Sequence, residues 1–195
     1  MTERMRELFD AVVENPHDLQ SSEELETLLR SEADWSSLVN LYRHLAEHGS
    51  DPVESSVWLE KAGAIAHQEM DDARIGAEFY WAAFEANPEL VHLLTPMRGL
   101  LHQIEEWESY VHVANAEVDH VEDDALRAAL IFEMGEVLEE KVGDQDRAIQ
   151  CFQAAFGADP HCLRALYAAR RIYRQQEQWE MVAQLLDLEL RTTEE

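Results

Sequence analysis

Metal-ligating residue types occur at helical spacing in two places. His44 and His48 lie four residues apart, and Glu117 precedes His120 by three, so each pair would point from one face of a helix. Helical di-iron sites use the E-x-x-H spacing twice and add further glutamates. Since the chain has nine histidines and 41 acidic residues, such pairs arise by chance, and we expect no metal and no other cofactor. A helical metal-binding enzyme that uses these four residues is kept as an alternative.

Motifs for other catalytic chemistry are absent from the sequence. The seven glycines are too far apart to form a phosphate-binding loop or a dinucleotide fingerprint, and neither G-x-S-x-G nor H-E-x-x-H occurs. Cys151 and Cys162 are the only cysteines, so a disulfide framework and a four-cysteine zinc site are both excluded. We therefore expect a protein that is not an enzyme and has no catalytic residues.

The charge of the chain restricts its partners. There are 41 Asp and Glu residues against 15 Lys and Arg, which gives a formal net charge of -26 at pH 7. Direct nucleic-acid binding depends on Lys and Arg that neutralise phosphates, and anionic membranes attract basic segments, so we expect neither partner. The first fifteen residues carry several charges and no apolar run of signal-peptide length, which favours a cytoplasmic protein.

An internal repeat organises the whole chain. Trp35, Trp107 and Trp179 are spaced 72 residues apart, and so are three prolines that each follow Asn or Asp. Residues 58–119 laid over 130–191 without gaps give 14 identities in 62 positions. Such a period is typical of repeat architectures, in which each unit buries its apolar face against its neighbours.

Each 72-residue unit is predicted to hold four helices. Apolar residues recur at spacings of three and four, as in Ile131, Met134 and Leu138, and no segment alternates between apolar and polar as a half-buried strand would. Asp159-Pro160 ends one helix and begins the next, because proline suits only the first turn of a helix. The sequence predicts an all-α protein.

Small and aromatic residues within each unit resemble those of the tetratricopeptide repeat (TPR) family, whose unit is a helical hairpin of about 34 residues. One unit carries Gly63, Gly76, Tyr80, Ala83 and Pro88, and the next carries Gly135, Ala148, Phe152, Ala155 and Pro160. In both, the first glycine comes one residue earlier than the family spacing, which indicates one extra residue in the turn. The intervening hairpins match more loosely. The resemblance implies a right-handed α-solenoid of about five antiparallel hairpins that binds a protein or peptide in its concave face.

About eleven helices are expected in a single domain, 1–195. After an orphan N-terminal helix in 1–16, the predicted hairpins are 17–48, 52–88, 89–120, 124–160 and 161–193. The predicted helices are Glu3–Glu14, Ser21–Arg30, Trp35–Glu47, Pro52–Glu69, Ala73–Ala86, Glu89–Gln103, Trp107–His120, Asp124–Lys141, Gln145–Gly157, His161–Gln175 and Glu180–Thr192. Pro96 predicts a kink or a restart in the sixth of them.

Two neighbouring first helices are predicted to differ in charge. With Met134, Gly135 and Leu138 directed inward, four carboxylates of one helix point outward, and no acid occurs between Asp159 and Glu177, where His161 and several arginines share the next helix. These arginines either bind a carboxylate or phosphate of a partner or neutralise the acidic helix beside them. The predicted groove residues are Glu133, Glu136, Glu139, Glu140, Arg164, Arg171, Arg174 and His102.

The sequence favours a non-enzymatic scaffold or adaptor that holds another protein or peptide, with carboxylates steering it toward a basic partner. One alternative is an acidic mimic of nucleic acid, or a chaperone, that occupies a basic nucleic-acid-binding protein. Homo-oligomerisation through the N-terminal helix is also left open, because that helix lacks its partner in the repeat.

Overall fold

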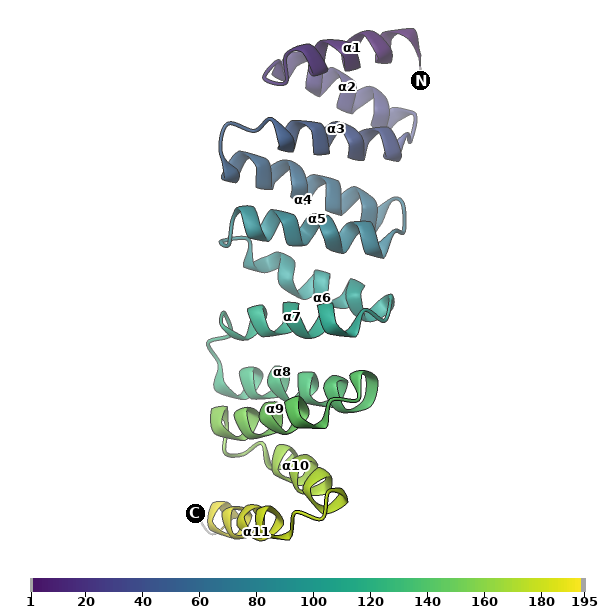
Figure 1. The fold of residues 1–195 in the computed structure, drawn as a ribbon. Coiled ribbons are helices and arrows are strands. Elements are labelled where there is room, and N and C mark those ends of the chain that lie inside the picture. The colour runs from purple at the N-terminus through teal and green to yellow at the C-terminus, as the bar shows by residue number, and fades with distance from the viewer. Residues whose placement is uncertain (1, 194–195) are drawn as a thin grey trace. The chain divides into compact units, whose positions relative to one another are not determined.

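The computed structural model of the chain describes residues 2–193, and it is all-α. Within that range there is no β-strand, and the eleven expected α-helices are present (Figure 1). They are α1 (Glu3–Glu14), α2 (Leu19–Ser31), α3 (Trp35–Glu47), α4 (Pro52–Gln68), α5 (Ala73–Ala86), α6 (Leu94–Gln103), α7 (Trp107–Val118), α8 (Asp124–Val137), α9 (Gln145–Ala158), α10 (Leu163–Gln175) and α11 (Trp179–Thr193). None of these helices is long and apolar enough to span a membrane.

Most predicted helices differ from the structure by one or more residues at an end, and three of these differences affect the candidate site or the predicted kink. The segment before Pro96 forms a short 3₁₀ helix, Val91–Leu93, and α6 starts at Leu94, so that the proline lies in the first turn, where its missing N–H costs no hydrogen bond. The acidic helix leaves α geometry after Val137 and continues as a π-helical turn, Leu138–Val142. His161 precedes α10 and does not share a helix with the arginines, because the Asp159-Pro160 stop extends to Cys162.

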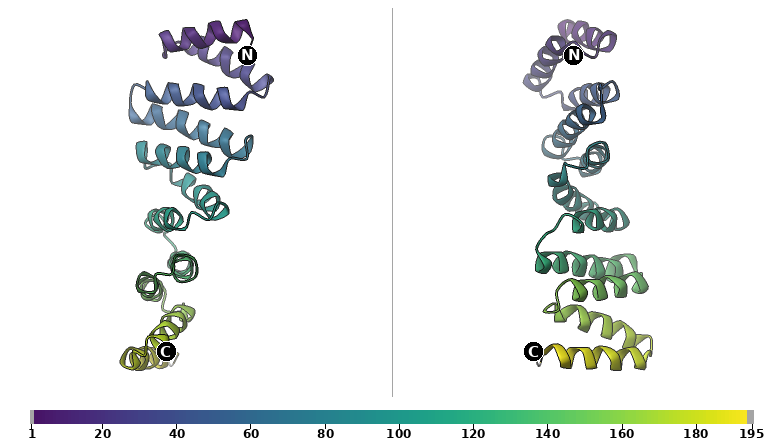
Figure 2. Two further views of the ribbon diagram at one scale, coloured as in Figure 1. Left: turned by 45° about the vertical axis from the view of Figure 1, so that its right-hand side comes forward. Right: turned by 90° about the vertical axis from the view of Figure 1, so that its left-hand side faces the viewer.

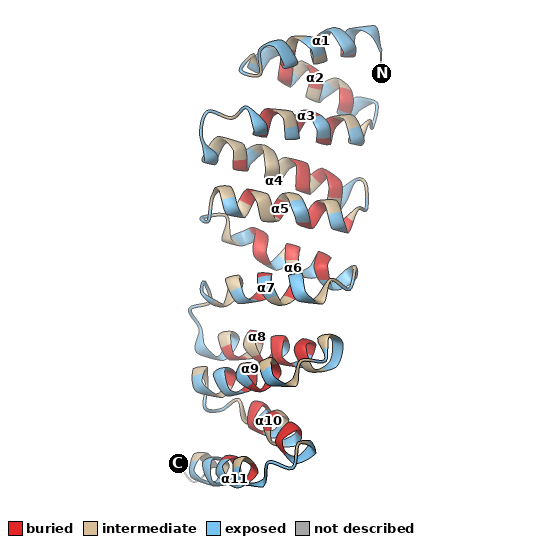
Figure 3. Ribbon diagram, in the orientation of Figure 1, coloured by how far each residue is buried: buried red, intermediate tan, exposed pale blue. Residues whose placement is uncertain are grey.

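The helices group into two compact units, one ending at Ile104 and one beginning at Glu105. Within each unit, consecutive helices pack side by side in antiparallel order, and α4 with α5 and α8 with α9 form the most extensive contacts (Figures 1 and 2). Buried residues line the surfaces where neighbouring helices meet (Figure 3). The predicted hairpin 89–120 contributes one helix to each unit, and the single domain stays a prediction.

The 72-residue period is visible in the backbone. Asn15, Asn87 and Asp159 each end a helix in nearly the same conformation, with φ of -139°, -142° and -138°. Their N–H groups donate to alanine carbonyls four residues earlier. The turns between helices repeat as well, because every second turn, beginning with the one between α2 and α3, contains one left-handed residue: Ala33, Asp71, Glu105, Gly143 and Glu177.

Glycine allows the two best-matched hairpins to close tightly. A Cβ added to Gly63 would lie 2.6 Å from the Tyr80 ring, and one added to Gly135 would lie 2.5 Å from the Phe152 ring. Both pairs join the first helix of a hairpin to its second, and Phe152 is fully buried. These are the contacts that the TPR resemblance implies, and they occur at equivalent positions of the repeat.

We expect Gly135→Ala to lower the free energy of unfolding by about 1–3 kcal/mol, because the added methyl group overpacks the Phe152 contact. Gly157→Ala in the same unit is the matched control, since a Cβ there meets no atom within 4 Å. That variant should gain up to about 1 kcal/mol from helix propensity. Urea unfolding of both variants measures the difference, and equal effects would show that the crossing at Gly135 is not tight.

Candidate functional site

The predicted acidic surface lies on α8 and the π-helical turn that follows it. Asp123 caps α8, because its carboxylate accepts a hydrogen bond of 2.8 Å from the N–H of Leu126. Met134, Gly135 and Leu138 are buried, which directs the side chains of Glu133, Glu136 and Glu140 into solvent.

Glu139 does not point outward as predicted. Its side chain is only 13% exposed, and Oε2 accepts a 2.5 Å hydrogen bond from the guanidinium of Arg171 on α10. The ordinary helical period accounts for this, because Glu139 follows the buried Gly135 by four residues and so lies at the edge of the buried side. One of the predicted arginines therefore neutralises one of the predicted carboxylates.

Contacts between neighbouring helices bring most of the predicted residues together. The guanidinium of Arg164 lies 4.2 Å from the centre of the Phe132 ring, as a cation–π contact between α10 and α8. The buried Tyr110 of α7 donates a 2.6 Å hydrogen bond from its hydroxyl group to Glu133. By contrast, Glu136 and Glu140 form no ion pair with any residue in the described range.

Glu136 is the carboxylate most affected by this arrangement. Partial burial raises its pKa above the usual value, and repulsion from Glu140 and Glu133 adds to the rise. Arg164 and Arg171 oppose the shift but do not cancel it. The charged form of Glu136 is therefore destabilised by its surroundings, and a cation placed beside it would relieve that cost.

A pocket of about 380 Å³ adjoins this surface between α10 and the start of α11. In its lining, Arg170 forms an ion pair with Glu189 of α11, and its guanidinium lies 5.1 Å from the centre of the Tyr167 ring. These two contacts hold the Arg170 side chain in place. Its lining consists of Tyr167, Arg170, Arg171, Arg174, Gln175 and Trp179. Sequence reasoning did not assign Tyr167 or Trp179 to a site, and used Trp179 only to define the repeat.

Two predicted site residues remain apart from these contacts. Arg174 is exposed in the pocket wall and forms no ion pair with another described residue. His102 is exposed at the end of α6, which belongs to the unit that ends at Ile104.

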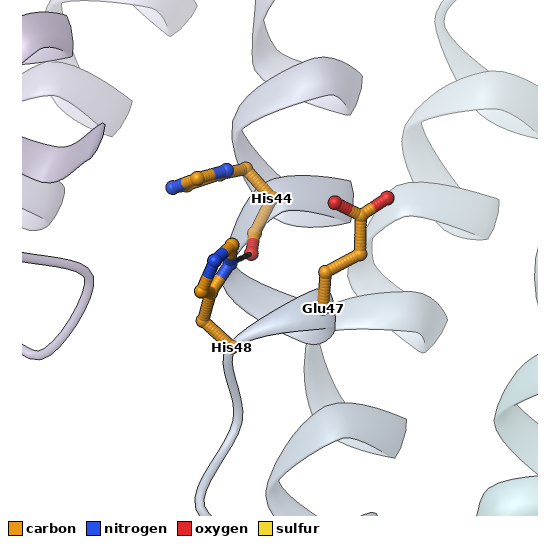
Figure 4. A group of neighbouring side chains, drawn as sticks. All are labelled: His44, Glu47 and His48. Carbon is orange, nitrogen blue, oxygen red and sulfur yellow. Dashed lines mark hydrogen bonds between the residues drawn. The ribbon is translucent and has the colours of Figure 1, made fainter.

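The histidine pair of α3 gains a third neighbour in the structure. His44, Glu47 and His48 each offer one ligand atom within 4.8 Å of the others, and no further His, Cys, Asp or Glu joins them within residues 2–193. Sequence reasoning missed Glu47, although its place between the histidines on one helical turn was the available signal. Figure 4 shows the imidazoles side by side, with Glu47 reaching up on the other side of the turn.

Hydrogen bonding limits what these three side chains offer to a metal ion. A tetrahedral zinc site, with bonds of about 2.0–2.2 Å, needs three or four such ligand atoms with free lone pairs. The Nδ1 atom of His48 is occupied by a 2.9 Å hydrogen bond with the carbonyl oxygen of His44, and the buried Nε2 atom of His44 has no partner. Glu117 and His120, the other proposed ligands, lie on and just after α7 in the second unit.

Comparisons with known proteins give a likeness in structure. No family model matches the chain, and no curated protein matches it. A crystal structure of MamA is 14% identical over 87% of this chain and 95% of its own, with a TM-score of 0.47. YrrB, described as a TPR protein with an unusual peptide-binding site, is 21% identical over 95% of this chain and 91% of its own, with a TM-score of 0.45. PilF of Pseudomonas aeruginosa is 13% identical over 96% of this chain and 78% of its own, with a TM-score of 0.42.

Replacement of Arg171 by Gln should lower the free energy of unfolding by about 1 kcal/mol, because it leaves the half-buried carboxylate of Glu139 without its cation. Arg174→Gln removes the same charge from the same helix without breaking an ion pair, and should change stability by less than about 0.5 kcal/mol. Urea unfolding at low salt compares the two, and equal losses would contradict the pairing.

Glu136→Gln should stabilise the protein at pH 7 by about 0.2–0.5 kcal/mol, since it removes like-charge repulsion on the helix. The pKa of Glu136 is raised in the folded state, so its charged form destabilises the folded protein. This destabilisation is absent at a pH where the carboxyl group is protonated in both the folded and unfolded states. The advantage of the variant should therefore disappear as the pH falls below about 4, the ordinary range of a glutamate pKa. Thermal unfolding across pH measures this, and a constant advantage would contradict it.

Removal of metal should not affect folding. We expect excess EDTA to leave the melting temperature within about 1 °C, whereas a structural zinc site contributes of the order of 10 kcal/mol. Elemental analysis of protein purified without chelators is the companion measurement. A stoichiometric metal that is lost in the His44→Ala variant would contradict the expectation that the protein binds no metal.

Proposed function

We propose that the protein is a non-enzymatic scaffold that binds a basic segment of another protein on the surface of α8 and α10. The observation that carries this proposal is the pair Glu136 and Glu140, two exposed carboxylates that repel each other and have no ion-pair partner in residues 2–193. A lysine or arginine placed between them would remove the repulsion and add a charge-assisted hydrogen bond.

The neighbouring arginines support recognition of a defined sequence. Arg171 is held by Glu139, and Arg164 is held over Phe132, so neither is free to neutralise Glu136 directly. Beyond them, Arg174 and the exposed ring of Trp179 line the pocket at the other end of α10. A partner segment with a basic group at one end and an acidic or aromatic group at the other would match this order of charges.

Long-range attraction supports a basic partner as well. A formal net charge of -26 raises the rate of encounter with positively charged surfaces and keeps anionic ones away. This attraction is screened in salt, since the Debye length falls from about 10 Å at 0.1 M to about 3 Å at 1 M. In a cytoplasmic setting near 0.15 M, close contacts would therefore decide which partner stays bound.

Binding of a fluorescein-labelled lysine-rich peptide tests the proposal. The double variant Glu136→Gln, Glu140→Gln should weaken binding about fivefold to tenfold, which corresponds to about 1–1.4 kcal/mol from two lost charge contacts. The same charge change at two exposed acids elsewhere in the unit, Glu122→Gln with Asp146→Asn, is the matched control and should weaken binding less than about twofold. Fluorescence anisotropy in low and high salt measures both, and equal weakening would show non-specific attraction.

A further inference from the structure

Helix α11 exposes an apolar face. Val182 and Leu185 are buried against α10, whereas Trp179 is 62% exposed and Leu186 is 43% exposed. Exposed Ala183 lies between them in sequence, and Leu190, also 61% exposed, continues the row at the next turn. Spacings of four, three and four place these residues on one stripe of the helix.

The internal repeat shows what kind of element packs on this stripe. The positions 144 residues earlier, on α3, include Val39 and Tyr42, which are buried under α4. Tyr42 stacks on Trp58 of α4 with ring centres 5.9 Å apart, and the carbonyl of Ala46 accepts a 2.8 Å hydrogen bond from the hydroxyl of Ser55. On α7, the equivalent Ala114 is fully buried, and α8 packs on that helix. In both cases an antiparallel amphipathic helix covers the stripe.

Helix α4 and the π-helical turn after α8 each carry one lysine. The chain has two lysines, and each lies over an aromatic ring of this interface. Lys61 of α4 lies 5.6 Å from the centre of the Tyr42 ring, and Lys141, just after α8, lies 5.4 Å from that of Trp107. Trp107 is the repeat equivalent of Trp179, so an element that covered α11 as the segment with Lys141 covers α7 would place a lysine over the Trp179 ring, whereas the equivalent of Tyr42 is Leu186.

Charge distinguishes a second copy of the chain from a basic helix as the element that covers the stripe of α11. A second copy of the chain would bring another -26 charges, and its α11 would bring the same exposed acids, Glu180 and Asp187, to the contact. A basic helix would bring opposite charge to those acids. The N-terminal helix differs from α11, because the exposed side of α1 is formed mainly by Glu3, Arg6, Glu7 and Asp10 and resembles the polar face of a cap.

We propose that the apolar stripe of α11 is a docking site for a basic amphipathic helix of a partner protein, which takes the position that α4 has on α3 and α8 has on α7. The apolar face of that helix packs on Trp179, Ala183 and Leu186, and a lysine lies over the indole ring. This site does not include Glu136 or Glu140, and it shares only Trp179 with the surface proposed above.

Two synthetic amphipathic helices test the site. Both carry the same leucine stripe, and their polar faces carry lysine in one and glutamate in the other. The lysine helix should bind at least about tenfold more tightly than the glutamate helix, and Leu186→Ser or Trp179→Ser should weaken it about tenfold, as expected for loss of a buried large side chain. Fluorescence anisotropy measures the affinities, and circular dichroism verifies that each variant is folded.

Matched variants separate this site from other surfaces. Leu126 of α8 is 66% exposed, so Leu126→Ser removes an exposed leucine elsewhere and should leave binding unchanged. The double variant Glu122→Gln, Asp146→Asn, at two exposed acids outside the stripe, should also bind the lysine helix within about twofold of wild type. Equal binding of both helices, or unchanged binding to Leu186→Ser, would overturn the proposal. Sedimentation that shows a dimer lost in Leu186→Ser would also overturn it and assign the stripe to a second copy.

Discussion

The close crossing of the two helices in each well-matched hairpin is the contact on which the other features depend. At Gly63 and Gly135 a ring from the second helix packs directly on the backbone of the first, with no space for a Cβ atom. This contact fixes which side of the first helix is buried, and so it decides which side remains for binding. The exposure of Glu133, Glu136 and Glu140 follows from the burial of Gly135 on the opposite side of α8.

Repetition explains why binding surfaces arise where they do. Each helix of a repeat array packs on its neighbours in sequence, so polar groups of successive helices meet at edges, as Glu139 and Arg171 do. Within residues 2–193, α1 packs mainly on α2 and α11 packs mainly on α10. In α1 the other side is largely polar, whereas α11 keeps the apolar side that α3 and α7 bury in the same register. The two ends of the described chain therefore differ in chemistry, although their helices belong to the same repeat.

The sequence predicts features that repeat and misses those that depend on one local departure. The all-α class, the eleven helices and the glycine contacts follow from the 72-residue period, because apolar and small residues return at fixed positions. The burial of Glu139 was missed because it depends on a pair with Arg171 of the next helix, which the repeat does not show. The exposure of Trp179 was missed because its type and spacing match Trp35 and Trp107, which are partly buried, and only the uncovered side of α11 distinguishes it. The role of Glu136 depends on Arg171 being occupied by Glu139, which is a three-dimensional fact.

Hydrogen exchange of the backbone amides, measured with and without a bound lysine-rich peptide, tests the central claim most directly. That claim is that α8, its π-helical turn and α10 form one binding surface, organised by Glu136, Glu140 and the Arg171–Glu139 pair. The account predicts slower exchange in residues 133–142 and 163–175 when the peptide is bound, and none of this slowing in the Glu136→Gln, Glu140→Gln variant. Protection spread evenly over all acidic helices, or protection that persists in the variant, would contradict it.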